Sequence, residues 1–204
     1  MQKRAQYIER NIEIMQEFPF AHPEVKCRLN RIYNSSFPGA VLYNLSSDSV
    51  SHMVNSWSVS VRQMWGLPRH AHRYLVRELG GQHAEEMLIT RYVKFLQSIK
   101  KSPKLAVQFM LEKIRRNVNT VTGTNIRYIQ DKVGYHRGDV LDMKPSMLRK
   151  NVRFSQIKEE DLWRVTIIKE IVNINQNTLQ LKDDNGAFLT FEQLNDILEY
   201  VSTS

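Results

Sequence analysis

The chain lacks several features that mark secreted, membrane-spanning or disordered proteins. A single cysteine, Cys27, excludes an internal disulfide and is typical of a reducing compartment. The apolar runs are far shorter than the roughly 20 residues that a membrane span requires, and the start of the chain, Met1 to Arg4, is charged rather than leading into the apolar core of a signal peptide. Its 204 residues, 42% hydrophobic and 25% charged, predict a globular protein. We therefore expect an intracellular chain, in the cytoplasm or nucleus, with no membrane partner.

The residue pattern of an active site is also lacking. Polymerase catalysis needs carboxylates clustered around two metal ions. The nearest pair, Asp183-Asp184, is followed by Asn-Gly, and this composition is typical of a turn. Gly80-Gly81 lacks the third glycine and the Lys-Ser/Thr of a phosphate-binding loop. Cys27 has apolar neighbours and no evident base, so we expect a buried thiol. The sequence predicts no catalytic site and no cofactor.

Three histidines leave a zinc site open as an alternative. His70, His72 and His83 lie within fourteen residues. A His-x-His spacing does not place both rings on one helical face, however, and no second cysteine or carboxylate pattern completes a ligand set. We expect capping or surface histidines, or phosphate contacts, and no metal.

Charge is distributed unevenly along the chain. The net charge is +8, and residues 1–150 hold 24 Lys and Arg against 12 Asp and Glu, whereas residues 151–204 hold 5 against 9. A basic body with an acidic tail is typical of a nucleic-acid-binding region that carries a separate small module. An incidental bias of a solvated surface is the alternative.

Helical periodicity dominates the chain up to about residue 133. Apolar residues recur at spacings of three and four in each expected helix, which indicates one buried face per helix. The stripes are Tyr7, Ile8, Ile12 and Met15; Val50, Met53, Val54, Trp57, Val61, Met64 and Trp65; Leu88, Tyr92, Phe95, Leu96 and Ile99; and Ala106, Met110, Ile114 and Val118. We expect the last of these helices to be capped by Ser102 and to begin near Pro103, and a further helix to follow Thr122-Gly123-Thr124 to Val133.

The pattern changes after Gly134. From Gly134 to about Ser155 there are two glycines, a proline and mixed charge. These features predict a linker, which we place at residues 136–155, between a basic helical region at 1–135 and an acidic module at 156–204. In that module we expect a helix through Leu162 to Val172, a short strand at 178–181, a turn at 184–186, and a last helix capped by Thr190 and Gln193. The fold class is mainly α: an irregular helical bundle with a small α+β C-terminal appendage.

Several ordered phrases are similar to a known family. They run Arg31 to Gly39, Val41 to Leu45, Trp57 to Arg62, Leu67-Pro68 with His72-Arg73-Tyr74, Lys101-Ser102-Pro103, Thr120 to Asn125, and Leu162 to Val165. In this order they resemble the region downstream of the polymerase core in non-LTR retrotransposon reverse transcriptase polyproteins. The resemblance implies an accessory role in holding template RNA, target DNA or their hybrid, beside a polymerase core whose catalytic aspartates lie upstream of this region.

Cations supply the predicted binding site. Lys and Arg attract phosphates without regard to base sequence, and exposed aromatic rings can stack on unpaired bases. Trp57, Tyr92 and Phe95 lie on apolar stripes and are expected in the core, which leaves Trp65 and Tyr74 as stacking candidates. The predicted nucleic-acid-binding residues, several of which flank helix ends, are Arg62, Arg69, His72, Arg73, Lys100, Lys101 and Lys104.

Two functions follow from these observations. The first is a non-catalytic nucleic-acid-binding segment of a retrotransposon reverse transcriptase, as a fragment or a truncated reading frame, with RNA or DNA and the parent polymerase core as partners. The second is a helical protein-interaction module derived from a retrotransposon, whose basic face would meet an acidic partner.

Overall fold

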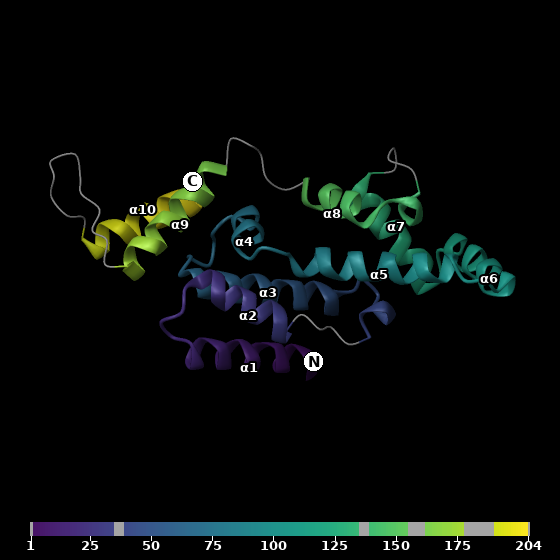
Figure 1. The fold of residues 1–204 in the computed structure, drawn as a ribbon, viewed down its shortest axis with the longest axis horizontal. Helices are drawn as coiled ribbons and strands as arrows, with labels where there is room; N and C mark the ends of the chain where they lie inside the picture. Colours follow the sequence, from purple (N-terminus) through teal and green to yellow (C-terminus); the bar gives the residue numbers. More distant parts are fainter. Residues whose placement is uncertain (1, 35–38, 135–138, 155–161, 178–189, 204) are drawn as a thin grey trace. The chain divides into compact units, whose positions relative to one another are not determined.

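The protein is mainly helical. The computed structural model describes residues 2–34, 39–134, 139–154, 162–177 and 190–203, and within these residues regular structure consists of α-helices and short 3-10 helices, without a strand (Figure 1). This confirms the mainly α class. The strand expected at 178–181 and the turn expected at 184–186 lie outside the described residues. No helix in the described part of the chain combines the length and apolarity needed to cross a membrane.

The chain forms two compact units, each assembled from segments that are distant in sequence. This division differs from the expected one, because the acidic C-terminal segment belongs with the N-terminal helices. Unit 1 comprises Met1–Ser36, Asn55–Gln82 and Ile157–Ser204, and unit 2 comprises Phe37–Val54 and His83–Gln156.

Unit 1 consists of helix pairs. Helix α1 packs against α2, and α9 packs against both α4 and α10. Its helices are α1 (Gln2–Glu17), α2 (Pro23–Asn34), the C-terminal part of α3 (Asp48–Trp65), α4 (Arg73–Leu79), α9 (Leu162–Asn177) and α10 (Phe191–Thr203). The predicted capping box of α10 is confirmed, since Thr190 and Gln193 exchange hydrogen bonds of 2.8 and 3.3 Å.

The apolar stripe of α3 is confirmed, and that of α1 is corrected. In α3, Trp57, Val61 and Trp65 are buried as their spacing predicts. In α1, Ile8 and Ile12 are exposed, and the buried face instead contains Tyr7, Asn11 and Ile14. These positions also have helical spacings of four and three residues. Because Asn11 is polar, a search for apolar residues alone does not find this face.

Unit 2 is built around α5. This helix contacts α6, α8 and both 3-10 helices, while α7 contacts α6 and α8. The elements are η1 (Ala40–Leu42), the N-terminal part of α3, α5 (Ala84–Lys100), α6 (Leu105–Arg116), α7 (Val121–Val133), η3 (Val140–Asp142) and α8 (Pro145–Phe154).

The linker expected at 136–155 is wrong for its described part. Residues 139–154 contain η3 and α8, and Leu141 and Leu148 are buried. Gln97 of α5 fixes this segment by donating hydrogen bonds to the carbonyls of Leu141 (3.1 Å) and Met143 (2.8 Å). The proline that argued for a linker stands at the first position of α8, where its missing N–H costs nothing.

Helices α5 and α6 each depart from prediction at one face. Leu88, Tyr92 and Leu96 are buried in α5, but Phe95 is exposed. Helix α6 begins at Leu105 with Lys104 as its N-cap, two residues later than expected. Of the residues expected on its buried side, Ala106, Met110 and Val118 are exposed, and the buried residue of α6 is Leu111.

Candidate nucleic-acid interface

The predicted binding residues are divided between the two units. Unit 1 holds Arg62, Arg69, His72 and Arg73, and unit 2 holds Lys100, Lys101 and Lys104.

Arg62 has a structural role in unit 1. The side chain is half-buried, and its Nη2 donates a 2.9 Å hydrogen bond to the carbonyl of Ala71, which anchors the connection between α3 and α4. Burial lowers the pKa of the guanidinium, and the nearby charge of Arg73 lowers it further. Arg62 is thus committed to the fold of this connection.

The segment between Arg69 and Arg73 contacts acidic α10. Arg69 and Arg73 are exposed, but the imidazole of His70 lies 3.7 Å from the carboxylate of Glu199. The backbone N–H of His72 donates to the carbonyl of Ser202 at 2.9 Å. Because α10 brings negative charge to this connection, the attraction for phosphate is reduced here.

Neither predicted stacking residue in unit 1 offers a free ring. Trp65 is 2% exposed, so this prediction is wrong: the residue ends the apolar stripe of α3 and belongs to the core. Tyr74 is half-buried, and the ring of His72 stacks on it with centroids 5.1 Å apart and planes inclined by 14°.

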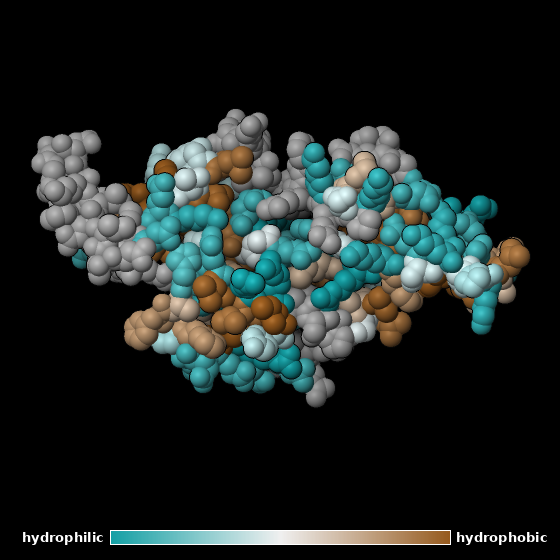
Figure 2. Space-filling model, in the orientation of Figure 1, coloured by the Kyte–Doolittle hydropathy of each residue, from teal (hydrophilic) through white to brown (hydrophobic). Residues whose placement is uncertain are grey.

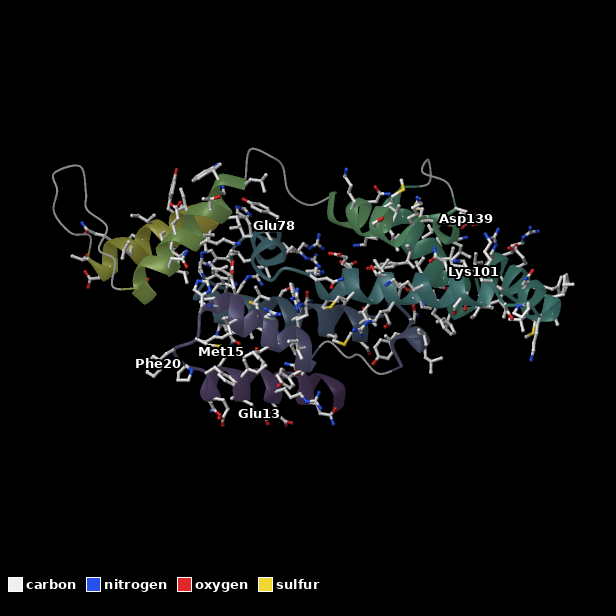
Figure 3. All side chains as sticks on the ribbon, viewed as in Figure 1. Glu13, Met15, Phe20, Glu78, Lys101 and Asp139 are labelled. Atoms are coloured by element: carbon white, nitrogen blue, oxygen red, sulfur yellow. The ribbon has the colours of Figure 1, made fainter. Side chains whose placement is uncertain are left out.

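The three predicted lysines of unit 2 differ in whether an acidic residue pairs with them. The Nζ of Lys100 forms a 2.5 Å ion pair with Asp142, which joins the end of α5 to η3. Lys101 and Lys104 are both exposed at the connection from α5 to α6, where Figure 3 labels Lys101. These two lysines are better placed than Lys100 to meet a phosphate.

The net charge of the protein belongs to unit 2. This unit contains fifteen Lys and Arg against seven Asp and Glu, whereas unit 1 contains fourteen of each. Sequence reasoning missed this division because it counted charge along the chain. Among the described residues, the exposed cations of unit 2 that were not predicted to bind are Lys94, Lys113, Arg116, Arg127, Lys132, Lys144 and Lys150.

Several acidic groups of unit 2 are engaged inside the unit. Glu85 is buried, accepts a 2.5 Å hydrogen bond from the hydroxyl of Tyr128 and pairs with Lys132 at 3.1 Å. Burial by itself would raise the pKa of Glu85, but the Tyr128 hydrogen bond and the Lys132 charge outweigh it and hold the pKa below its usual value. Asp139 likewise bonds Arg115 at 2.6 Å. These engaged acids leave exposed positive charge in excess on the surface.

Cys27 and His83, which were considered as a nucleophile and a metal ligand, lie in structural environments. Cys27 is buried with its Sγ 3.6 Å from the Sδ of Met64, and burial raises the pKa of its thiol to about 12, which disfavours a nucleophilic thiolate. His83 caps α5 by accepting the N–H of Glu85. No group of three His, Cys, Asp or Glu positioned for a metal is found among the residues that the structure describes. The Asp183-Asp184 pair lies outside those residues.

The chain matches no protein-family model, no curated protein and no solved structure. Its fold and charge define a mainly helical protein with one neutral and one strongly basic unit.

Proposed function

We propose that the protein is a non-catalytic nucleic-acid-binding segment in which unit 2 contacts the phosphate backbone. The observation that carries this proposal is the concentration of the whole net charge of +8 in unit 2. Exposed cations at the start of α6 and along it, including Lys101, Lys104 and Lys113, supply the contacts. Attraction of this kind is long-ranged and insensitive to base sequence.

The resemblance to the region downstream of a retrotransposon polymerase core supports the same proposal. An accessory segment of such a polyprotein would hold RNA or DNA beside the polymerase, and it would need affinity rather than base specificity. Phosphate contacts provide affinity of that kind. We propose this origin for the chain as a fragment or a truncated reading frame.

Salt-dependent binding tests the proposal. Affinity of the full chain for a labelled single strand should be measured by fluorescence anisotropy over a range of salt concentrations. Each neutralised phosphate contributes about 0.7 to the slope of log affinity against log salt for single strands. Replacing Lys101, Lys104 and Lys113 together by Gln should reduce that slope by up to about two units.

A matched variant in unit 1 provides the control. Arg28, Arg69 and Arg73 are also exposed, so their joint replacement by Gln removes the same charge from the neutral unit. The control should leave the slope nearly unchanged. Equal losses in both triple variants, or binding that is indifferent to salt, would refute a phosphate-binding role for unit 2.

A protein-interaction module derived from a retrotransposon is the second candidate. Apolar side chains on α1, α2 and their connection favour it, because Phe20 is 95% exposed and Ile32 and Tyr33 are also exposed. Phe20 projects away from the α1–α2 connection in Figure 3. Binding to an acidic protein that unrelated nucleic acids fail to displace would favour this function over the first.

A further inference from the structure

Helix α6 has two apolar faces, of which one is exposed. Leu111, with the half-buried Val107 and Ile114, forms the face that meets the rest of unit 2. The other face carries Leu105, Phe109 and Met110, which are 80%, 70% and 60% exposed. Phe109 is more exposed than the other aromatic residues of unit 2 within the described ranges.

Cations lie within this exposed face. Lys113 is four residues and Arg116 seven residues after Phe109, so all three side chains project from the same side of the helix. Lys113 and Arg116 are exposed, and Arg116 makes only a loose contact with Glu112 at 3.7 Å. Figure 2 shows hydrophobic and hydrophilic side chains intermingled where α6 lies in Figure 1.

We propose that this face of α6 binds single-stranded nucleic acid, with Phe109 stacked on an unpaired base and Lys113 and Arg116 on the neighbouring phosphates. The inference rests on the proposed function and adds the class of nucleic acid. Stacking needs the flat face of an unpaired base, which a duplex hides within its stack. An apolar ring has no donor or acceptor for base edges, so the site tolerates any base.

The placement of the charges favours nucleic acid over an apolar protein partner. A docking helix normally presents a continuous apolar stripe with its charges at the margin. A partner helix seated on Phe109 would bury Lys113 and Arg116, at a cost that needs matching acids at both positions. A single strand supplies a base for the ring and phosphates for both cations.

The test compares three probes on the full chain: an oligothymidine strand, a strand of the same length with abasic sites, and a duplex. Phe109→Ala should weaken binding of the oligothymidine strand by about 5- to 150-fold, the range for loss of one base–aromatic stack. Affinity for the abasic strand and the duplex should stay unchanged, as should the salt slope. Phe109→Trp should retain tight binding of the single strand.

The control is Phe20→Ala, which removes a ring from unit 1 that is even more exposed than Phe109 and should affect none of the probes. Equal affinity of wild type and Phe109→Ala for the oligothymidine strand, with salt-dependent binding intact, would overturn the stacking site while the proposed function stands. Salt-independent or undetectable binding of all three probes by wild type would refute the proposed function itself. Loss of self-association in Phe109→Ala, with unchanged nucleic-acid binding, would assign the face to a contact between copies.

Discussion

Asn125 should contribute strongly to the stability of unit 2. Its side chain is fully buried in α7, where Oδ1 accepts the backbone N–H of Leu45 at 2.7 Å and Nδ2 donates to the carbonyl of Tyr43 at 2.8 Å. One amide thus satisfies two backbone groups of a segment about eighty residues earlier in the chain. Those groups have no other role in a helix or strand ladder, because residues 43–45 are irregular.

Asn125→Leu should lower the free energy of unfolding by about 2–4 kcal/mol. Leu45 is buried, so its orphaned N–H costs about 1–3 kcal/mol, and the half-buried carbonyl of Tyr43 adds about 1 kcal/mol. Leucine is chosen because it is apolar and has as many side-chain heavy atoms as asparagine, so no empty cavity contributes to the loss.

Urea unfolding gives the free energy, and amide hydrogen exchange locates the effect. In Asn125→Leu the amide of Leu45 should lose protection, because its hydrogen bond to Oδ1 is gone. The exposed Asn119 is the control, and its replacement by Ala should change stability by less than about 0.5 kcal/mol. A leucine variant as stable as wild type, with the Leu45 amide still protected, would refute this account of Asn125.

Two further variants test one contact in each unit. Glu85→Gln should cost about 1.5–3 kcal/mol near neutral pH, since Glu85 accepts a hydrogen bond from Tyr128 as a carboxylate. The folded pKa of Glu85 lies below its ordinary value of 4.5, so this stability is present above that value and is lost as pH falls through the folded pKa. The free energies of unfolding of both proteins in urea should therefore converge once the pH is below the folded pKa. A difference that does not depend on pH would contradict the argument. Gly80→Ala should cost about 1–3 kcal/mol, because its Cβ would lie 2.6 Å from the buried ring of Trp57. An unchanged melting temperature would show that the Trp57 ring can shift at no cost in stability.

Local signals in the sequence were sufficient for several elements. The stripe from Trp57 to Trp65, the Thr190–Gln193 capping box and the helix that ends at Val133 are set by interactions within a few residues, and all three are confirmed. The N-cap of α7 is also local but was missed, because the helix was expected to follow Thr122-Gly123-Thr124 and begins at Val121. Thr120 accepts the N–H of Gly123 through its hydroxyl, which is the kind of local bond that a short motif encodes.

Features that depend on distant contacts were not predictable in this way. Helix α6 has apolar residues on both sides, and only its packing against α5 and α7 decides that Leu111 is buried while Met110 is exposed. The segment at 139–154 was taken for a linker because of its glycines, proline and mixed charge, whereas its structure depends on contacts with α5 and on the hydrogen bonds from Gln97. Periodicity cannot reveal which of two faces finds a partner.

The candidate site was predicted only in part, again because some of its residues have partners that the sequence pattern does not reveal. Lys101 and Lys104 are exposed where the sequence placed them, whereas Lys100 is paired with Asp142 and Arg62 with a backbone carbonyl. Asp142 lies 42 residues after Lys100, and the partner of Arg62 is a backbone carbonyl, so the sequence pattern did not indicate either contact. Phe109, the residue of the proposed stacking site, was not among the aromatic candidates, because the expected stripe of this helix ran through Ala106 and Met110.

The acidic C-terminal segment follows directly on the basic body along the chain, but it folds into unit 1 and does not count toward the charge of unit 2. Within unit 1, Glu199 of this segment lies 3.7 Å from His70, and Lys169 pairs with Glu24 of α2 at 2.9 Å. Exposed charges are screened over about 10 Å at roughly 0.1 M salt, so a phosphate responds mainly to the charges of the surface that it approaches. The charge that a phosphate meets is therefore that of the compact unit it approaches, and for unit 2 that charge equals the net charge of the whole protein.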